Sequence, residues 1–151
     1  MKVKPKIKVR DMTVEDLPNV FNIGVREFDI SKIYHQYWSL TELTSHFERD
    51  RELCIVAETD GEVIGFALGH KRFSAWEENL GYLEWIAVSK EYQRRGVASM
   101  LCEEVLKRFK AMGIKRILAD VVVEEDQASK KLLEKFSFKE LFSVIWFIRE
   151  A

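Results

Sequence analysis

The stretch YLEWIAVSKEYQRRGVA, residues 82–98, decides how this chain is interpreted. Its first part, residues 82–88, is mostly apolar and predicts a buried central strand. A basic segment with Arg94, Arg95 and Gly96 follows, and residues 96–112 then place apolar side chains at helical spacing. A strand, a basic loop and a helix N-terminus in this order suit a phosphate, because the loop N–H groups and the helix dipole both favour an anion.

This loop differs from two well-known phosphate-binding motifs. No Lys-Ser or Lys-Thr pair follows Gly96, so the loop is not a nucleotide-binding P-loop. The GxGxxG pattern of dinucleotide-binding folds is also absent from the sequence. Gly96 is expected to let the backbone approach a ligand closely, where a Cβ atom would obstruct it.

The rest of the chain predicts alternating strands and helices in one α/β (α+β) domain over residues 1–151, with a mixed central sheet and helices on both faces. The pair Asp60-Gly61 predicts a hairpin turn. Thr13 and Asp16 predict a helix start. The expected elements are a strand at 7–12, helices from 13 and 41, strands at 54–57, 63–69 and 82–88, a helix at 96–112, a strand at 117–123, a helix at 127–136 and a strand at 142–148. The expected order is therefore β-α-α-β-β-β-α-β-α-β.

Composition excludes several classes of function. The net charge of −1 gives no sign of a nucleic-acid partner. Cys54 and Cys102 stand apart without a CxxC spacing, so neither a disulfide framework nor a metal site is expected. No apolar run has the length of a membrane span, and residues 1–11 lack the apolar core of a signal peptide. We therefore expect a cytoplasmic protein without a membrane partner.

Residues 93–98, Gln-Arg-Arg-Gly-Val-Ala, match the pattern Gln/Arg-x-x-Gly-x-Gly/Ala. Placed between a strand and a helix, this segment resembles the signature of the GNAT superfamily of acetyl-CoA-dependent N-acetyltransferases. Residues 132–138, Leu-Leu-Glu-Lys-Phe-Ser-Phe, resemble the family's second marker, usually Leu-Tyr-Glu-Lys-x-Gly-Phe. The resemblance implies a GNAT-like fold and transfer of the acetyl group of acetyl-CoA to a primary amine in a ternary complex.

The resemblance also implies roles for individual residues. Main-chain N–H groups of residues 94–98 are expected to hold the pyrophosphate of acetyl-CoA. Main-chain groups of Ile86 and Val88 are expected to pair with the pantetheine arm, where the strands at 82–88 and 117–123 splay apart. The N–H of Val88 is a candidate oxyanion donor. The full expected cofactor set is Ile86, Ala87, Val88, Gln93, Arg94, Arg95, Gly96, Val97, Ala98, Asp126 and Ser129, with no metal.

Acetyl transfer needs a neutral amine, so some group has to accept the proton of the ammonium ion. Glu84 is the first catalytic candidate, since many family members carry glutamate there, and Tyr82 is the second. In a regular strand Tyr82, Glu84 and Ile86 share one face. Burial is expected to raise the pKa of Glu84 toward that of a base at neutral pH. The alternative for Glu84 is a structural carboxylate that is hydrogen-bonded to the backbone or paired with a lysine. The alternative for Tyr82 is an aromatic ring that only packs.

Three departures from the family pattern stand out. Leu133 replaces the tyrosine that often protonates the departing thiolate. Leucine cannot donate a proton, so water or Tyr82 would have to protonate the thiolate. Ser137 replaces a glycine that usually adopts a left-handed conformation, and Asp126, where asparagine is common, is also placed to cap the next helix. Residues 138–150 leave room for one closing strand instead of two, which suggests a homodimer that covers the sheet edge.

The acceptor site is expected between residues 28–40 and 142–147. The rings of Phe28, Tyr34, Tyr37 and Trp38 would suit an apolar or a cationic acceptor, with core packing as the alternative. His35 is a candidate base, but it is more typical of a surface or hydrogen-bonded position. Protein N-termini, lysine side chains and small amines all stay open as acceptors. The alternative function is a non-catalytic acyl-CoA-binding sensor or assembly module, which Leu133 and Ser137 favour and Glu84 opposes.

Overall fold

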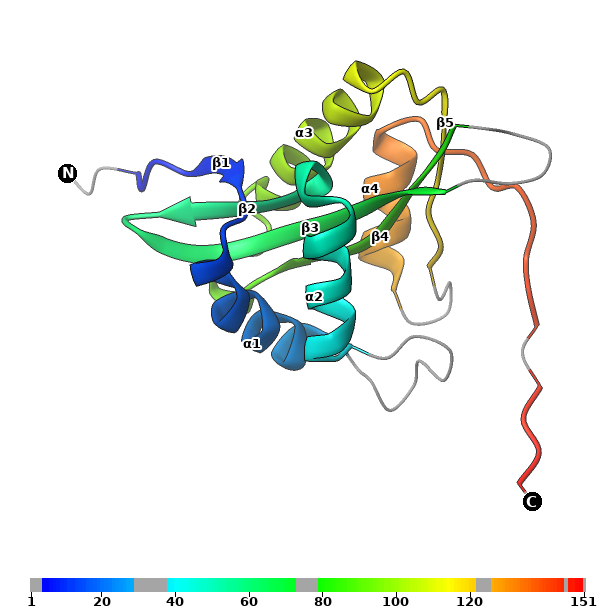
Figure 1. Ribbon diagram of the computed structural model, residues 1–151, viewed down its shortest axis with the longest axis horizontal. Coiled ribbons are helices and arrows are strands. Elements are labelled where there is room, and N and C mark those ends of the chain that lie inside the picture. The colour runs from blue at the N-terminus through cyan, green and yellow to red at the C-terminus, as the bar shows by residue number, and fades with distance from the viewer. Residues whose placement is uncertain (1–3, 29–37, 73–78, 122–125, 146, 151) are drawn as a thin grey trace. The chain divides into compact units, whose positions relative to one another are not determined.

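Five strands form one mixed sheet, and their order in the sheet follows their order in the chain (Figure 1). The strands are β1 (Lys8–Asp11), β2 (Cys54–Thr59), β3 (Glu62–Arg72), β4 (Leu80–Val88) and β5 (Arg116–Leu118). Strands β1 to β4 pair antiparallel, whereas β4 and β5 pair parallel. The expected mixed sheet is thus confirmed in this computed structural model, which describes residues 4–28, 38–72, 79–121, 126–145 and 147–150.

The chain forms two compact units, Met1–Asp120 and Val121–Ala151. The first contains the whole sheet with α1 (Leu17–Glu27), α2 (Leu40–Arg49) and α3 (Val97–Ala111). It also contains three short 3₁₀ helices, which are η1 (Val14–Asp16), η2 (Arg51–Leu53) and η3 (Lys90–Tyr92). The second contains α4 (Gln127–Lys135). None of the helices in the described ranges has the length and apolar character needed to cross a membrane.

Helices cover both faces of the sheet, as predicted (Figure 1). Helices α1 and α2 bury apolar side chains with Phe66 and Trp85 of the sheet. Helix α3 packs on the other face, where a Cβ atom on Gly69 or Gly81 would lie 2.8 Å from the ring of Phe109. Glycine at these two strand positions therefore lets α3 approach the sheet closely.

An aromatic cluster fills the face under α1 and α2. The Trp38 ring contacts those of Phe28, Phe66 and Trp85, with centroids 5.2–5.3 Å apart. A Cβ atom on Gly24 would lie 2.2 Å from the Trp38 indole, so only glycine fits beneath the ring. The core-packing alternative is thus the correct one for Phe28 and Trp38. The other acceptor candidates, Tyr34, His35 and Tyr37, lie outside the described residues.

Local signals in the sequence placed most element ends correctly. Asp60 and Gly61 both have positive φ, 50° and 78°, as a type I′ hairpin turn requires. Helix α2 begins at Leu40, one residue before the predicted Thr41, and Ser39 caps it by accepting a hydrogen bond from the N–H of Glu42. Gly113 ends α3 in the left-handed conformation, with φ of 75°.

Two strand predictions are wrong within the described residues. The expected strand at 117–123 is observed only as Arg116–Leu118, and residues 119–121 form no strand. The expected strand at 142–148 is absent from residues 142–145 and 147–148. These side chains have high β propensity but are exposed, Phe142 by 72% and Phe147 by 91%. Propensity alone does not make a strand, because its main chain also needs a partner with which to pair.

A partly buried ion pair stabilises the start of α1. The Arg10 guanidinium donates to both carboxylate oxygens of Asp16, at 2.7 and 2.9 Å. The same carboxylate accepts a hydrogen bond from the N–H of Thr13 at 2.7 Å. The side chain of Arg10 is one quarter exposed and that of Asp16 only 9%. The Arg10 guanidinium outweighs burial and lowers the pKa of Asp16 below its usual value.

Asp16→Asn should destabilise the fold at neutral pH by about 1–3 kcal/mol, because it removes one of the two carboxylates that pair with the partly buried Arg10 guanidinium and leaves only Glu58. A lowered pKa in the folded state stabilises the protein above the unfolded pKa, about 3.9 for aspartate, and this stabilisation is lost as the pH falls further. The difference between variant and wild type in urea unfolding should therefore be constant from pH 7 to about 4 and shrink below that. Glu15→Gln, at an exposed position in the same turn, is the control. An equal loss at pH 3 and pH 7 would contradict this account.

Candidate active site

Strand β4 is paired along its whole length on one side and only at its start on the other. Its ladder with β3 runs from Leu80 to Val88. Its ladder with β5 joins Leu80, Gly81 and Tyr82 to Arg116–Leu118 and ends there. No strand of the described ranges pairs with β4 from Leu83 onward on the β5 side. The ladder between β4 and β5 therefore stops at Tyr82, because β5 ends at Leu118.

The main chain of β4 also has a defined orientation at this open edge. The N–H of Ser89 donates to the carbonyl of Ile64, 2.8 Å away, so Ser89 faces the β3 side. Because main-chain groups alternate in direction along an antiparallel strand, Ala87 faces β3 as well, and Ile86 and Val88 face away from it. The carbonyl of Val88 accepts a hydrogen bond from Nε2 of Gln93 at 2.9 Å.

Strand β4 has one residue more than β3 in the middle of their ladder. Leu68 pairs with Trp85 and the next residue, Gly69, pairs with Leu83. Glu84 therefore has no residue opposite it and forms a β-bulge. A bulge interrupts the regular alternation of side chains, so that neighbouring residues of the strand can point to the same face.

Glu84 and Trp85 do point to the same face, toward α2. Glu84 Oε2 lies 3.1 Å from Nε2 of His46, and Nε1 of Trp85 lies 3.5 Å from Oε1 of Glu42. The prediction that Glu84 and Ile86 share one face is therefore wrong. Since Trp85 belongs to the core under α1 and α2, the alternation beyond the bulge directs Ile86 to the other face.

The loop between β4 and α3 is exposed and has an unusual backbone. Arg94 and Gly96 both have positive φ, 61° and 82°, and Gly96 directly precedes α3. Such a backbone next to a helix N-terminus gathers main-chain N–H groups that attract anions. The side chains of Arg94 and Arg95 are exposed. No atom lies within 4 Å of a Cβ atom built on Gly96, so the protein itself leaves this space open.

Gln93 anchors this loop to the rest of the first unit. Besides Val88, its Nε2 group donates to Oε2 of Glu27 at 2.9 Å. The other carboxylate oxygen of Glu27 accepts a hydrogen bond from the N–H of Lys90 at 3.2 Å. The Gln93 side chain therefore links the end of α1 to the end of β4 through hydrogen bonds within the protein.

Glu84 lies between two histidines that were not predicted from the sequence to be near it. Its Oε2 atom is 3.1 Å from Nε2 of His46, on α2, and 3.0 Å from Nδ1 of His70, on β3. His46 Nε2 also lies 3.3 Å from Oε1 of Glu42. The side chain of His46 is 1% exposed, that of His70 13% and that of Glu84 21%, so the cluster is open to solvent mainly at Glu84 and His70.

The pKa of Glu84 moves in the opposite direction to the prediction. Burial by itself raises the pKa, as expected, but His46 and His70 outweigh burial and lower it to about 2. The alternative for Glu84 was a carboxylate bonded to the backbone or to a lysine. Its contacts among the described residues are instead with two imidazoles. Glu84 therefore stays ionised at neutral pH.

Tyr82 adjoins this cluster through His70. Their rings stack with centroids 5.3 Å apart and an interplanar angle of 13°. The Tyr82 hydroxyl donates a hydrogen bond to Oδ1 of Asp120. Burial and the carboxylate of Asp120 raise the pKa of Tyr82 above its usual value, so its hydroxyl keeps its proton.

The predicted residues in the second unit have local roles there. Asp126 caps α4, since its carboxylate accepts a hydrogen bond from the N–H of Ser129 at 2.9 Å. Ser137 follows the end of α4 with φ of 64°, so it adopts the left-handed conformation of the glycine it replaces.

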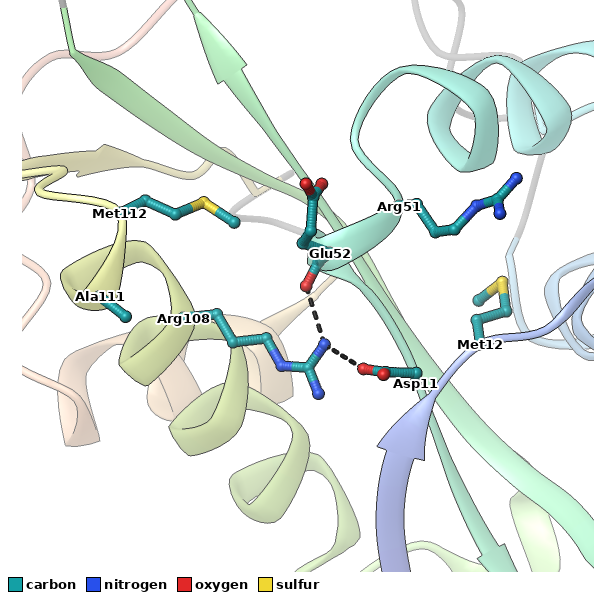
Figure 2. A pocket seen from close by; sticks show the side chains of 7 residues that line it. All are labelled: Asp11, Met12, Arg51, Glu52, Arg108, Ala111 and Met112. Carbon is teal, nitrogen blue, oxygen red and sulfur yellow. Dashed lines mark hydrogen bonds and ion pairs between the residues drawn. The ribbon is translucent and has the colours of Figure 1, made fainter.

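A separate open pocket of about 640 Å³ lies at the other end of α3 (Figure 2). Arg108 crosses it and pairs with Oδ1 of Asp11 at 2.5 Å and with the carbonyl of Glu52 at 2.8 Å. Helix α3 has 15 residues, and its rise separates this pocket from the loop at residues 93–98 by about 15–20 Å. The pocket contains none of the predicted site residues.

The chain belongs to the acetyltransferase (GNAT) family, because the model of that family matches residues 17–138. An acetyltransferase of Photorhabdus laumondii, plu1384, is 29% identical over 91 residues. That match covers 60% of this chain and 59% of the relative, so it spans less than two thirds of the relative's length.

Solved structures with the same fold include two N-acetyltransferases. The aminoglycoside N-acetyltransferase AAC(6')-Iy, in complex with CoA, has a TM-score of 0.78 at 21% identity, covering 100% of this chain and 99% of that chain. The ribosomal-protein-S18-alanine N-acetyltransferase from Escherichia coli has a TM-score of 0.73 at 22% identity, covering 91% of this chain and 80% of that chain. At these identities the likeness establishes the fold.

Gly96→Ala tests the loop conformation by itself. Alanine fits the open space but is strained at positive φ, so the variant should lose about 1–2 kcal/mol of unfolding free energy. Urea unfolding with the cofactor absent measures this loss. Wild-type stability in the variant would show that Gly96 does not hold the left-handed conformation.

Proposed function

We propose that this chain transfers the acetyl group of acetyl-CoA to a primary amine. The observation that carries the proposal is the open edge of β4, which leads from the Glu84 cluster to the left-handed loop at the N-terminus of α3. A pantetheine arm can pair with such an edge as an added strand does, and a pyrophosphate suits the loop. Family membership supports the same chemistry.

In this proposal the cofactor is held mainly by main-chain groups. Ile86 and Val88, which face away from β3, pair with the pantetheine arm, and the N–H of Val88 stabilises the negative charge that develops on the thioester oxygen. The N–H groups of residues 94–98 bind the pyrophosphate. Arg94 and Arg95 add positive charge at an exposed position.

The acceptor amine arrives as an ammonium ion and has to lose a proton before it attacks the thioester carbon. We place this proton on the cluster of Glu84, His46 and His70. The ionised carboxylate of Glu84 attracts the ammonium ion, and the imidazoles beside it provide the basic nitrogens, a common arrangement in general base catalysis. Glu42 and Asp120 add negative charge near the same histidines and Tyr82, which also suits a cationic acceptor.

Tyr82 is the candidate proton donor to the departing thiolate, because Leu133 cannot fill that role. Its hydroxyl is protonated and lies beside the cluster. Its raised pKa and its hydrogen bond to Asp120 make it a weaker acid than free tyrosine, so water is the alternative donor. After the amine has attacked, the C–S bond breaks and the CoA thiolate takes up a proton from Tyr82 or from water.

The proposal is tested by titrating the protein with acetyl-CoA in a calorimeter and then adding amines while free thiol is measured. The panel should contain an aminoglycoside, a peptide with a free N-terminus and a lysine peptide. Thiol release with one class would establish the reaction and identify the acceptor class. Acetyl-CoA binding without release from any amine would favour the non-catalytic binding module, and no binding would contradict the proposal.

Gly96→Asp should abolish binding of acetyl-CoA, because it adds a negative charge and a side chain where the pyrophosphate would lie. Calorimetry on the purified variant measures the loss. Gly113→Asp is the matched control, since Gly113 also has positive φ with no atom within 4 Å of its Cβ position, but follows the other end of α3. Unchanged affinity in Gly96→Asp, or an equal loss in Gly113→Asp, would contradict the position of the site.

Glu84→Gln should slow acetyl transfer by about 10²–10⁴-fold, the usual contribution of general base catalysis, because it removes the carboxylate that holds the ammonium ion beside the basic imidazoles; the affinity for acetyl-CoA should stay nearly unchanged. The reason is that Glu84 lies in the acceptor cluster and not in the loop that holds the pyrophosphate. Turnover at saturating amine and calorimetry with acetyl-CoA separate the two effects. A fully active Glu84→Gln enzyme would show that the amine loses its proton outside the cluster of Glu84, His46 and His70.

A further inference from the structure

The cluster around Glu84 brings three possible metal-ligand atoms close together, an arrangement that proton transfer alone does not require. Three different elements supply its donor atoms, which are Nε2 of His46 from α2, Nδ1 of His70 from β3 and Oε2 of Glu84 from β4. All three atoms lie within 4.8 Å of one another. Each imidazole nitrogen is 3.0–3.1 Å from the carboxylate oxygen.

These close contacts are not aligned hydrogen bonds. Neither Nε2 of His46 nor Nδ1 of His70 has an acceptor in hydrogen-bonding geometry among the described residues, although both atoms are buried. Leaving such buried nitrogens without a hydrogen bond is costly. Donor atoms that crowd together without pointing at one another are typical of ligands arranged around an ion.

We propose that His46, His70 and Glu84 bind a divalent transition-metal ion, and that zinc is the ion they fit best. Zinc takes nitrogen and oxygen ligands at about 2.0–2.1 Å in a tetrahedron, which places neighbouring ligand atoms about 3.3 Å apart. The two nitrogen–oxygen separations, 3.0 and 3.1 Å, are close to that spacing, and the two imidazole nitrogens lie within 4.8 Å of each other. Magnesium and calcium prefer oxygen ligands, so two imidazoles disfavour them.

Three protein ligands leave one position of the tetrahedron open. Oε1 of Glu42 lies 3.3 Å from Nε2 of His46, which makes it the neighbouring carboxylate that would complete the shell or hold a water molecule bound to the ion. Glu84 lies on the same face as Tyr82 and His70, as the alternation from Tyr82 requires, and the bulge lets Trp85 point to this face as well.

Zinc binding does not depend on the proposed acetyl transfer. Where both hold, the ion occupies the atoms that would accept the proton of the amine. Zinc should then inhibit transfer without weakening the binding of acetyl-CoA, whose proposed contacts lie on the β4 edge and the loop before α3.

The experiment is a calorimetric titration of the tag-free chain with zinc chloride, after removal of metal with a chelator. We expect one zinc ion per chain and no comparable binding of magnesium. His70→Ala should weaken zinc binding at least about tenfold, since the loss of even an indirect partner of a ligand costs that much. Glu104→Gln removes a carboxylate on α3, across the sheet from α2, and should bind zinc as the wild type does.

His46 is buried, so its replacement risks unfolding, whereas His70 and Glu84 are partly exposed. The variants His70→Ala and Glu84→Gln therefore carry the test, with circular dichroism to establish that each is folded. Wild-type protein that takes up no zinc, or zinc affinity unchanged in both variants, would overturn the metal site. Zinc binding lost in both variants supports it even if no amine is acetylated, whereas thiol release without zinc binding would support the acetyltransferase and reject the metal site.

Discussion

The extra residue in β4 is the constraint on which the site depends. A regular ladder with β3 would turn Glu84 and Trp85 to opposite faces of the sheet. The bulge lets both point toward α2, so that Trp85 completes the aromatic core while its neighbour Glu84 reaches two histidines. One local irregularity thus joins the hydrophobic core to a polar cluster, and the rigidity of the core holds the carboxylate in place.

The same strand connects this cluster to the loop before α3. Among the residues that the structure describes, β4 has a strand partner on one side only beyond Tyr82. Its end is connected to the loop through Gln93 and to α1 through Glu27. The fold therefore places an open main-chain edge, a backbone suited to an anion and a cluster of acids and imidazoles along one element. Such a row matches a long cosubstrate with a phosphate at one end and a reactive acyl group at the other.

Much of this could be predicted from the sequence because it is local. The hairpin at Asp60-Gly61, the helix from Val97 and the left-handed Ser137 all follow from residue types at fixed offsets. The bulge could not be predicted, because it depends on how β3 and β4 align, and neither glycine nor proline marks Glu84. His46 and His70 were missed for the same reason, since they meet Glu84 only through the packing of α2 and the register of β3. The predicted direction of the pKa shift of Glu84 was wrong because the prediction considered burial without these two histidines.

Amide hydrogen exchange with and without acetyl-CoA tests the central claim most directly, because it reports on the main-chain groups that the cofactor would use. Exchange of the amides of Ile86, Val88 and residues 94–98 should slow on addition of acetyl-CoA, while amides around the pocket at Arg108 should not change. Protection confined to other parts of the chain, or no protection at all at saturating acetyl-CoA, would contradict the placement of the cofactor along β4.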